Sequence, residues 1–385
     1  MALLLLSPVT RADIVGVQAW AYQLQDISVE QIAANSTFEL IVMDPSADGS
    51  IAGEWSAEQI QQIAASGKLP IAYLSIGEAE NYRWYWQPSW DTDPPGWLGP
   101  ENPQWPGNFK VRFWVAAWQS LVFQSLHRIV DQGFAGVYLD VIDAYYFWSE
   151  EQQQRPQADA DMVLFVRSLA DSLHAWGGGG RLVIPQNGEF LPVEDDVEGQ
   201  LDDDWWQAID AIGVEDVFCP GEADEDNPWA PDAERLAMLS EYRQHDKTVL
   251  SVEYLNTPAA IEQFRQAAQT HDFLPYATVR ALDELRDGLG GTDLRPPDPR
   301  RARAEALQAR VEAGVLRLRL PQPAHGILYI RLFDMSGRLV AGRDTKSGAE
   351  SQPELQLSGL PAGRYVCEVR DQGRLHVATP FTWIP

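Results

Sequence analysis

The sequence predicts an α/β protein, a (β/α)8 TIM barrel followed by a small all-β sandwich domain. Within residues 13–287, eight short apolar segments alternate with segments that carry helix signals, a pattern typical of βα units around a parallel sheet. Residues 288–305 are rich in Gly, Pro and Arg and have no apolar period, which indicates a linker. Residues 306–385 alternate apolar and polar positions, as antiparallel strands do, with hairpin turns expected at Ser336-Gly337 and Ala362-Gly363.

Each expected strand is a short apolar run bounded by turn or helix signals. The runs lie at 14–24, 39–44, 69–80, 137–139, 181–189, 211–216, 248–254 and 274–280. Runs that are apolar throughout are typical of strands buried on both faces. Most of the runs end in a carboxylate or an amide, so polar groups are expected at the carboxyl ends of the strands.

Helix signals fill the intervals between these runs. Ser28 with Gln31, and Ser56 with Gln59, have the spacing of capping boxes. Further helices are expected at 118–131, at 161–176 and after Thr257-Pro258, where proline would occupy the first helical position. A doubly wound sheet is the alternative fold, but neither G-x-G-x-x-G nor a P-loop is present, which favours the barrel.

The interval between the third and fourth strands is unusually long. Residues 81–118 hold seven tryptophans among prolines and glycines. A βα-loop of this length in a compact domain is more often functional than accidental. We expect it to lie over the carboxyl ends of the strands, as one wall of a cleft.

Charge is distributed unevenly along the 385 residues. The net charge of −27 is made up of −32 before residue 300 and +5 from there on. An acidic barrel domain disfavours nucleic acid and anionic membranes as partners and favours a cationic polymer. Adaptation of the surface to salty surroundings is the alternative explanation, and it would also fit the low lysine content.

The amino-terminal segment predicts export. Residues 1–12 combine a leucine-rich core with Pro8 and Ala12, so we expect a signal peptide remnant and a secreted or cell-surface protein. No stretch reaches the roughly 20 apolar residues of a membrane span. Cys219 and Cys367 lie far apart in sequence, which indicates neither a disulfide framework nor a cysteine-based metal site.

The strand ends predict the chemistry. Asp140 follows the fourth strand and Glu215 ends the sixth, and the carboxyl ends of barrel strands gather around one site. Carboxylates with tryptophans nearby fit glycoside hydrolysis, in which two carboxyl groups divide the acid and base work and a like charge raises one pKa. Other side chains near the strand ends are expected to bind substrate: Trp20, Tyr22, Asp44, Glu78, Asp143, Tyr145, Asn187, Glu189 and Glu253.

Other interpretations of these residues are open. Clustered carboxylates could hold a hard cation, but the acids are dispersed over many strands, so no metal and no cofactor is expected. Ser75 lacks a G-x-S-x-G context, which disfavours a serine hydrolase. Structural roles are the alternatives: helix capping by Asp140 or Asp143, pairing of Glu78 and Glu80 with Arg83, a buried polar pair of Glu253 with Tyr254, and packing by Trp20, Tyr22 and Tyr145.

Several unusual motifs occur in an order that resembles a known family. They are YLSIGEAENYRWYW (73–86), ENPQWPGN (101–108), GFAGVYLDVIDAY (133–145), PQNGE (185–189) and GVEDVF (214–218). Over residues 14–285 the chain resembles the extracellular relatives of glycoside hydrolase family 114, the endo-α-1,4-polygalactosaminidases. The resemblance implies a TIM barrel that cleaves a galactosamine-rich polysaccharide with an acid pair on strands four and six, here Asp140 and Glu215. The family commonly has an acidic residue where this chain has Ala135, a change expected to affect packing.

The tail resembles a second family. Within residues 327–383, FDMSGRLV and LSGLPAGRYVCEV are similar to the carboxyl-terminal sorting domains of type IX secretion substrates, although the ending TPFTWIP lacks their usual basic residue. This resemblance implies the secretion machinery as a partner, and a plain accessory sandwich is the alternative.

These observations together predict a secreted hydrolase that cleaves internal bonds of a partly deacetylated, cationic galactosamine polymer by a two-carboxylate mechanism. A non-catalytic or surface-anchored barrel that binds glycan is the alternative function. The presence of both Asp140 and Glu215 favours the enzyme.

Overall fold

The chain divides into two compact units, Met1–Thr292 and Asp293–Pro385. The computed structural model describes residues 14–177, 180–193, 200–287, 308–312, 315–319, 326–334, 339–347, 354–357, 360–361, 363–371, 374–377 and 381–383. The expected signal peptide remnant (1–12) and the expected linker (288–305) lie outside the described residues. No helix in the described ranges is long and apolar enough to cross a membrane.

The first unit is an α/β domain built on parallel strands. One sheet has the order β1 (Trp20–Gln23), β2 (Leu40–Met43), β3 (Leu69–Ser75), β7 (Gly136–Asp140) and β8 (Leu182–Pro185). A second contains β9 (Ala211–Glu215), β10 (Thr248–Tyr254) and β11 (Leu274–Thr278). A parallel bridge between Gln186 and Gly213 joins them, and the indole of Trp20 on β1 donates to the carbonyl of Leu274 on β11 (2.9 Å). The strands thus follow chain order around the domain, as the sequence predicts.

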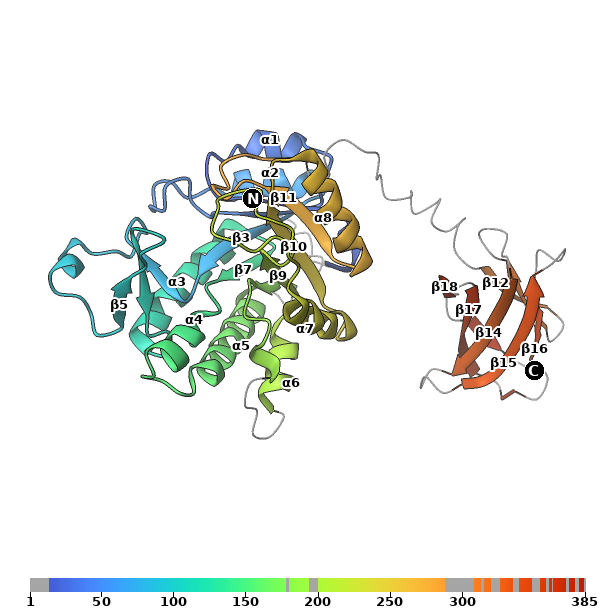
Figure 1. Ribbon diagram of the computed structural model, residues 1–385. Coiled ribbons are helices and arrows are strands. Elements are labelled where there is room, and N and C mark those ends of the chain that lie inside the picture. The colour runs from blue at the N-terminus through green and yellow to red at the C-terminus, as the bar shows by residue number, and fades with distance from the viewer. Residues whose placement is uncertain are drawn as a thin grey trace, which may run out of the picture. The chain divides into compact units, whose positions relative to one another are not determined.

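Helices cover the outside of these strands (Figure 1). The longer ones are α1 (Val29–Ala34), α2 (Ala57–Ala65), α3 (Ala116–Gln132), α5 (Ala158–Gly177), α6 (Gln200–Ala208), α7 (Ala233–Gln244) and α8 (Pro258–Thr270). Short turns are η1 (Ile14–Gly16), η2 (Pro88–Asp91), α4 (Ala144–Tyr146), η3 (Phe147–Glu151) and η4 (Leu191–Val193). The predicted helix starts are confirmed, although the caps differ. Ser28 caps α1 by accepting from the backbone N–H of Gln31, and Ser56 and Gln59 form a complete capping box on α2. Pro258 opens α8 after Thr257, whose side chain makes no capping hydrogen bond.

The space between the strands is filled by aromatic side chains. Trp20, Tyr22, Tyr138 and Tyr276 are each at most 2% exposed, and neighbouring ring centroids in this group lie 5.3–6.4 Å apart. Tyr138 needs a glycine opposite, because a Cβ on Gly213 would come within 1.9 Å of its hydroxyl oxygen. The polar strand ends lie at one end of this packed interior.

Three expected strand boundaries are wrong. The fifth expected strand, 181–189, ends at Pro185 as β8, so Asn187 and Glu189 follow it. The first strand begins at Trp20, because residues 14–16 form a 3-10 turn. The third ends at Ser75, and residues 78–80 belong to a separate antiparallel sheet in the order β4 (Glu78–Glu80), β6 (Asn108–Val111) and β5 (Leu98–Glu101). This small sheet makes up much of the long insertion, and in Figure 1 β5 projects at the edge of the domain.

Most of the tryptophans in the insertion pack on one another. The chain of ring contacts runs from Trp86 to Trp90, Trp97 and Trp118, with centroids 5.1–5.2 Å apart. Trp105, in contrast, is 52% exposed. These four rings therefore pack on one another and form a core of the insertion.

The second unit consists of small antiparallel sheets. One contains β12 (Gln308–Glu312), β13 (Val315–Arg319) and β16 (Glu354–Gln356); the other contains β14 (Gly326–Asp334), β15 (Leu339–Ser347), β17 (Gly363–Asp371), β18 (Arg374–Val377) and β19 (Phe381–Trp383). The two sheets contribute buried Leu316, Leu318, Ile330 and Leu332. β14 and β15 pair as a hairpin, whose turn at Ser336-Gly337 lies outside the described residues. The hairpin expected at Ala362-Gly363 is wrong, because β16 pairs with β13 and β17 with β14.

Candidate active site

Two carboxylates lie at the carboxyl ends of nearby parallel strands. Asp140 is the last residue of β7 and Glu215 the last residue of β9, with β8 between these strands in the chain. Both residues are partly exposed. The ends of the two strands meet at the residues that follow β8, because the backbone N–H of Gln186 donates to the carbonyl of Leu139 and that of Asn187 to the carbonyl of Gly213, both at 2.8 Å. Burial and the charge of Glu215, in that order, raise the pKa of Asp140 to about 8. The two acids singled out in the sequence thus occupy one site.

The Asp140 carboxylate accepts two hydrogen bonds. The hydroxyl of Tyr73 on β3 donates to Oδ2 (2.5 Å), and the backbone N–H of Val141 donates to Oδ1 (2.7 Å). Val141 has a φ of 59°, a left-handed conformation that is rare for a β-branched residue and costs about 1–3 kcal/mol. A side chain on Gly77 would exclude this turn, because its Cβ would lie 2.1 Å from the Val141 carbonyl oxygen. The strained turn directs a backbone donor at the acid.

The Glu215 carboxylate is held in the same manner. The hydroxyl of Tyr254, the last residue of β10, donates to Oε2 (2.6 Å), and Nδ2 of Asn187 donates to Oε1 (3.1 Å). The backbone N–H of Glu215 returns a bond to Oδ1 of Asn187 (3.3 Å). Asn187 also has a left-handed backbone (φ 61°), which asparagine tolerates better than most residues. All four oxygens of the pair therefore have donors before substrate binds.

Asp143 is a third carboxylate in this region. It follows β7 by three residues, is exposed to solvent and makes no capping hydrogen bond to α4. Desolvation by the surrounding protein raises its pKa to about 6; the charge of Lys110 opposes this rise, and the charge of Glu215 adds to it. Asp143 is therefore mostly ionised at neutral pH.

Cations from the insertion neutralise Asp44, which follows β2, and Glu78 and Glu80 on β4. Arg83 contacts Oδ2 of Asp44 (2.8 Å) and Oε2 of Glu80 (2.6 Å). The amine of Lys110 lies 2.6 Å from Oε1 of Glu78, so Glu78 pairs with Lys110 and not, as considered from the sequence, with Arg83. These contacts place the insertion at the carboxyl ends of the strands, as predicted. Asp44 and Glu78 are buried and already paired, which argues against their predicted contact with substrate.

Two further acids are neutralised by arginines from later in the chain. Glu189, 3% exposed, forms an ion pair with Arg235 of α7. Both carboxylate oxygens of Asp216 accept from Arg280 at 3.0 Å. Glu189 is thus an internal anchor, which contradicts its prediction as a substrate contact. Among the strand-end carboxylates that the structure describes, Asp140, Asp143 and Glu215 form no ion pair.

Glu253 was expected to bind substrate, and this prediction is wrong. Its side chain is fully buried, and its two oxygens accept from the backbone N–H groups of Phe218 (2.7 Å) and Cys219 (3.1 Å). Burial raises its pKa to about 8. Glu253 fixes the loop that follows β9, while the next side chain, Tyr254, reaches Glu215.

The three aromatic candidates have different environments. Trp20 is fully buried inside the domain, so the prediction that it contacts sugar is wrong. Tyr22 is 2% exposed and donates to Oε1 of Gln186 (3.1 Å), and burial followed by the charge of Asp140 raises its pKa. Tyr22 therefore packs in the interior beneath the acids and does not offer an exposed ring to a sugar. Tyr145, 5% exposed, lies on α4 beside Asp143.

Sequence reasoning missed most partners of the acids. Tyr73 and Tyr254 lie in apolar strands, where a tyrosine is expected to pack in the core. The cations Arg235 and Arg280 come from a helix and a loop without a recognisable motif, whereas the sequence already offers Arg83 as a partner for Glu78. A stricter use of the two-residue strand period could have found Tyr254, because Glu253 and its neighbour must face opposite sides.

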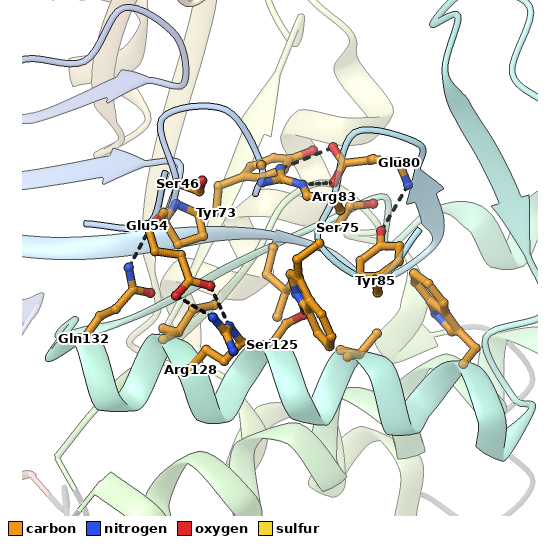
Figure 2. A pocket seen from close by; sticks show the side chains of 17 residues that line it. Ser46, Glu54, Tyr73, Ser75, Glu80, Arg83, Tyr85, Ser125, Arg128 and Gln132 are labelled. Atoms are coloured by element: carbon orange, nitrogen blue, oxygen red, sulfur yellow. Dashed lines mark hydrogen bonds and ion pairs between the residues drawn. The ribbon is translucent and has the colours of Figure 1, made fainter. Parts of the chain in front are cut away.

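A separate cavity lies behind the site, between β3 and α3 (Figure 2). Its volume is about 40 Å³, and its lining includes Tyr73, Glu80, Arg83, Ser125 and Arg128. Ligand pockets usually measure about 300–1,000 Å³, so this space suits water and not a sugar. Figure 2 shows the polar side chains of α3 turned toward it, and none of the lining residues is Asp140 or Glu215.

The site as described suits acid–base chemistry by carboxyl groups. Within the described ranges, no group of three or more His, Cys, Asp or Glu side chains is arranged to hold a metal ion. The donors around the pair are tyrosines, a backbone N–H and an amide, which orient carboxylates. Such a pair can give a proton to one oxygen while its second member acts as nucleophile or base.

Comparisons with known proteins agree with this description. A model described as glycoside-hydrolase family GH114 matches residues 7–292. An uncharacterized protein of Methanocaldococcus jannaschii is 37% identical over 275 residues, which cover 69% of this chain and 77% of that protein. An uncharacterized protein of Thermotoga maritima is 37% identical over 293 residues, which cover 72% and 85%.

Two solved structures share the fold. The glycoside hydrolase domain of PelA from Pseudomonas aeruginosa has a TM-score of 0.52 at 16% identity, and the match covers 70% of this chain and 97% of that domain. Aspergillus fumigatus Ega3 in complex with galactosamine has a TM-score of 0.52 at 17% identity, covering 70% and 94%. At such identities these similarities establish the fold alone.

Proposed function

The chain belongs to the glycoside-hydrolase family GH114, and on that premise we propose that it cleaves internal glycosidic bonds of a galactosamine-rich, partly deacetylated polysaccharide, with Asp140 and Glu215 as the catalytic pair. We further propose that its parallel strands close into a (β/α)8 barrel, as expected for a glycoside hydrolase of this family. The observation that carries the proposal is the pair itself, two strand-end carboxyl groups that interact and are each oriented by a tyrosine.

The electrostatics of the pair support a two-carboxylate mechanism. A pKa of about 8 for Asp140, raised by burial and by Glu215, means that at neutral pH the pair holds one proton. One carboxyl group can then protonate the leaving glycosidic oxygen. The other attacks the anomeric carbon or removes a proton from the attacking water. Over the full reaction, the hydroxyl group of water is added to the anomeric carbon. The remaining proton of that water restores the proton that the carboxyl pair gave to the leaving group.

The charges around the pair support an amino sugar. Most strand-end acids are matched by Arg83, Lys110, Arg235 or Arg280, whereas Asp143 is exposed, ionised at neutral pH and without an ion pair among the described residues. A sugar ammonium group would supply the missing cation. The charge of −32 before residue 300 would attract a polycation from a distance, an effect that salt screens within about 8–10 Å. Ega3, one of the similar structures, is complexed with galactosamine.

The location of the protein is also part of the proposal. Residues 1–12 support export, and the second unit supports either type IX sorting or an accessory role as a β-sandwich. Fractionation of a native culture tests this, because a secreted or surface protein is recovered from the medium or the outer cell surface. Recovery from the cytoplasm alone would contradict it.

The substrate proposal is tested with a panel of polymers. Wild-type protein is incubated with deacetylated galactosaminan, the same polymer after acetylation, chitosan and a neutral galactan, and chain length is followed. The deacetylated galactosaminan should be shortened fastest, and its cleavage should slow as salt rises. Equal cleavage of the neutral galactan would overturn the cationic substrate, and binding without cleavage of any polymer would favour a glycan-binding role.

A further inference from the structure

Arg235 reaches from a helix to the site. It lies in the first turn of α7, where the N-cap Asp232 accepts from its backbone N–H (3.0 Å). Its guanidinium has three partners at the ends of β8 and β9. Nε pairs with Oε1 of Glu189, Nη1 donates to the backbone carbonyl of Glu215 (2.9 Å), and Nη2 donates to Oδ1 of Asn187 (3.2 Å). One side chain thus connects both strand ends.

These contacts fix the direction of the Asn187 amide. Its Oδ1 receives donors from Arg235 and from the backbone N–H of Glu215, and neither of these groups can accept a hydrogen bond. A flipped amide would set its NH2 against two donors and its oxygen against the Glu215 carboxylate. Nδ2 must therefore face Oε1 of Glu215, where it donates. The orientation of a donor to Glu215 depends on Arg235.

The shape of this loop is held by several contacts besides Arg235: the backbone N–H of Asn187 donates to the carbonyl of Gly213 (2.8 Å), and the hydroxyl of Tyr242 donates to the carbonyl of Glu189 (3.3 Å). Asn187 and Gly188 are both left-handed, with φ of 61° and 67°, and a Cβ on Gly188 would come within 2.5 Å of Cγ2 of Ile142. A left-handed non-glycine residue persists where its surroundings over-determine it. The guanidinium supplies such a constraint by binding Asn187 and Glu189 on either side of the glycine.

We infer that Arg235 is a positioning residue for catalysis: it locks the Asn187 amide so that Glu215 keeps its donor and its orientation. This inference rests on the proposed role of Glu215. Replacing the guanidinium should therefore lower the rate of turnover more than the affinity for substrate, because the three contacts of Arg235 are with the protein and not with the sugar.

The kinetic test is a double-mutant cycle on the cleaved polymer. Arg235→Lys keeps the charge but cannot make all three contacts, and Asn187→Ala removes the donor. Each should lower kcat about 10- to 100-fold with little change in KM, and the double variant should fall no further than the worse single one. Arg128→Lys is the matched control. Arg128 lies on α3 and forms a bidentate pair with Glu54 (2.5 and 2.8 Å), so this substitution also removes a paired guanidinium but should leave kcat near wild type.

A measurement without substrate separates this inference from the proposed function. The side-chain NH2 signals of Asn187, assigned by their loss in Asn187→Ala, are recorded by NMR in wild type and in Arg235→Lys. Release of the amide should move these signals toward those of a solvent-exposed asparagine and speed the exchange of their protons in Arg235→Lys. Unchanged Asn187 signals in folded Arg235→Lys, or full additivity in the kinetic cycle, would overturn the inference. Absence of cleavage by wild type would refute the proposed function and leave the NMR comparison interpretable.

Discussion

The hydroxyl of Tyr254 donates to Oε2 of Glu215 at 2.6 Å, across neighbouring strands β10 and β9. Arg280 lies over the Tyr254 ring, 4.0 Å from its centroid, and also holds Asp216, the residue after Glu215. The contact with Arg280 therefore holds the ring of Tyr254 in place, and its hydroxyl is directed at one carboxylate oxygen of Glu215. A corresponding bond joins Tyr73 to Asp140.

We expect Tyr254→Phe to lower kcat about 10- to 100-fold, because Glu215 loses a hydrogen bond to a charged group while the ring is kept. Steady-state kinetics on the polymer check this, with thermal unfolding to verify the fold. Tyr146→Phe is the control, since Tyr146 is 54% exposed. Full activity in Tyr254→Phe would show that the bond does not orient Glu215 for catalysis.

The pH dependence of the reaction follows from the raised pKa of Asp140. The pair needs one proton, and that proton is present below about pH 8 and lost above it. The kcat/KM of the wild type should therefore decline on the alkaline side with a midpoint near 8. A profile that stays flat to pH 10 would contradict a proton held by this pair.

The raised pKa of Asp140 also makes stability depend on pH. A carboxyl group whose pKa is raised by folding binds more protons in the folded state, so the folded state loses stability as pH rises from about 4 to about 8. At pH 8, Asp140→Asn removes this cost, and we expect the free energy of unfolding to rise by about 1–3 kcal/mol while hydrolysis is lost. Denaturant unfolding of both proteins at pH 5 and pH 8 measures it. The gain should be smaller at pH 5, and a gain that is larger at pH 5 would refute the linkage.

Asp143 should decide the preference for amines. Asp143→Asn is expected to raise KM for deacetylated galactosaminan about tenfold, because a sugar ammonium loses its counter-charge, and to leave KM for the acetylated polymer unchanged. The ratio of the two KM values is the quantity to measure. Equal changes for both polymers would show that Asp143 does not recognise the amine.

Sequence reasoning found the site through the strand ends. The apolar runs before Asp140 and Glu215 predict strands, and the fold then brings their carboxyl ends together. The same reasoning misplaced the site residue of β10 by one position, choosing Glu253 where Tyr254 contacts Glu215. A shift of one residue changes the face of a strand, and composition alone does not fix that face.

Other parts of the site depend on contacts that sequence does not display. Arg235 lies 20 residues after Glu215, and only the packing of α7 against the strands brings its guanidinium to Asn187. Composition shows that the insertion is rich in tryptophan, but it does not display that Trp86, Trp90, Trp97 and Trp118 contact one another. Whether an aromatic ring packs or binds is decided by its neighbours in space.

The most direct test of the central claim is chain-length analysis of deacetylated galactosaminan after incubation with wild type, Asp140→Asn and Glu215→Gln. Both substitutions keep the size of the side chain and remove its acid–base function. Asp131→Asn is the control, because Asp131 is an exposed carboxylate on α3 whose partner is His127. We expect shortening by wild type and by Asp131→Asn, and a loss of at least about 10³-fold in rate for both site variants. Undiminished shortening by folded Asp140→Asn or Glu215→Gln would contradict the assignment of this pair.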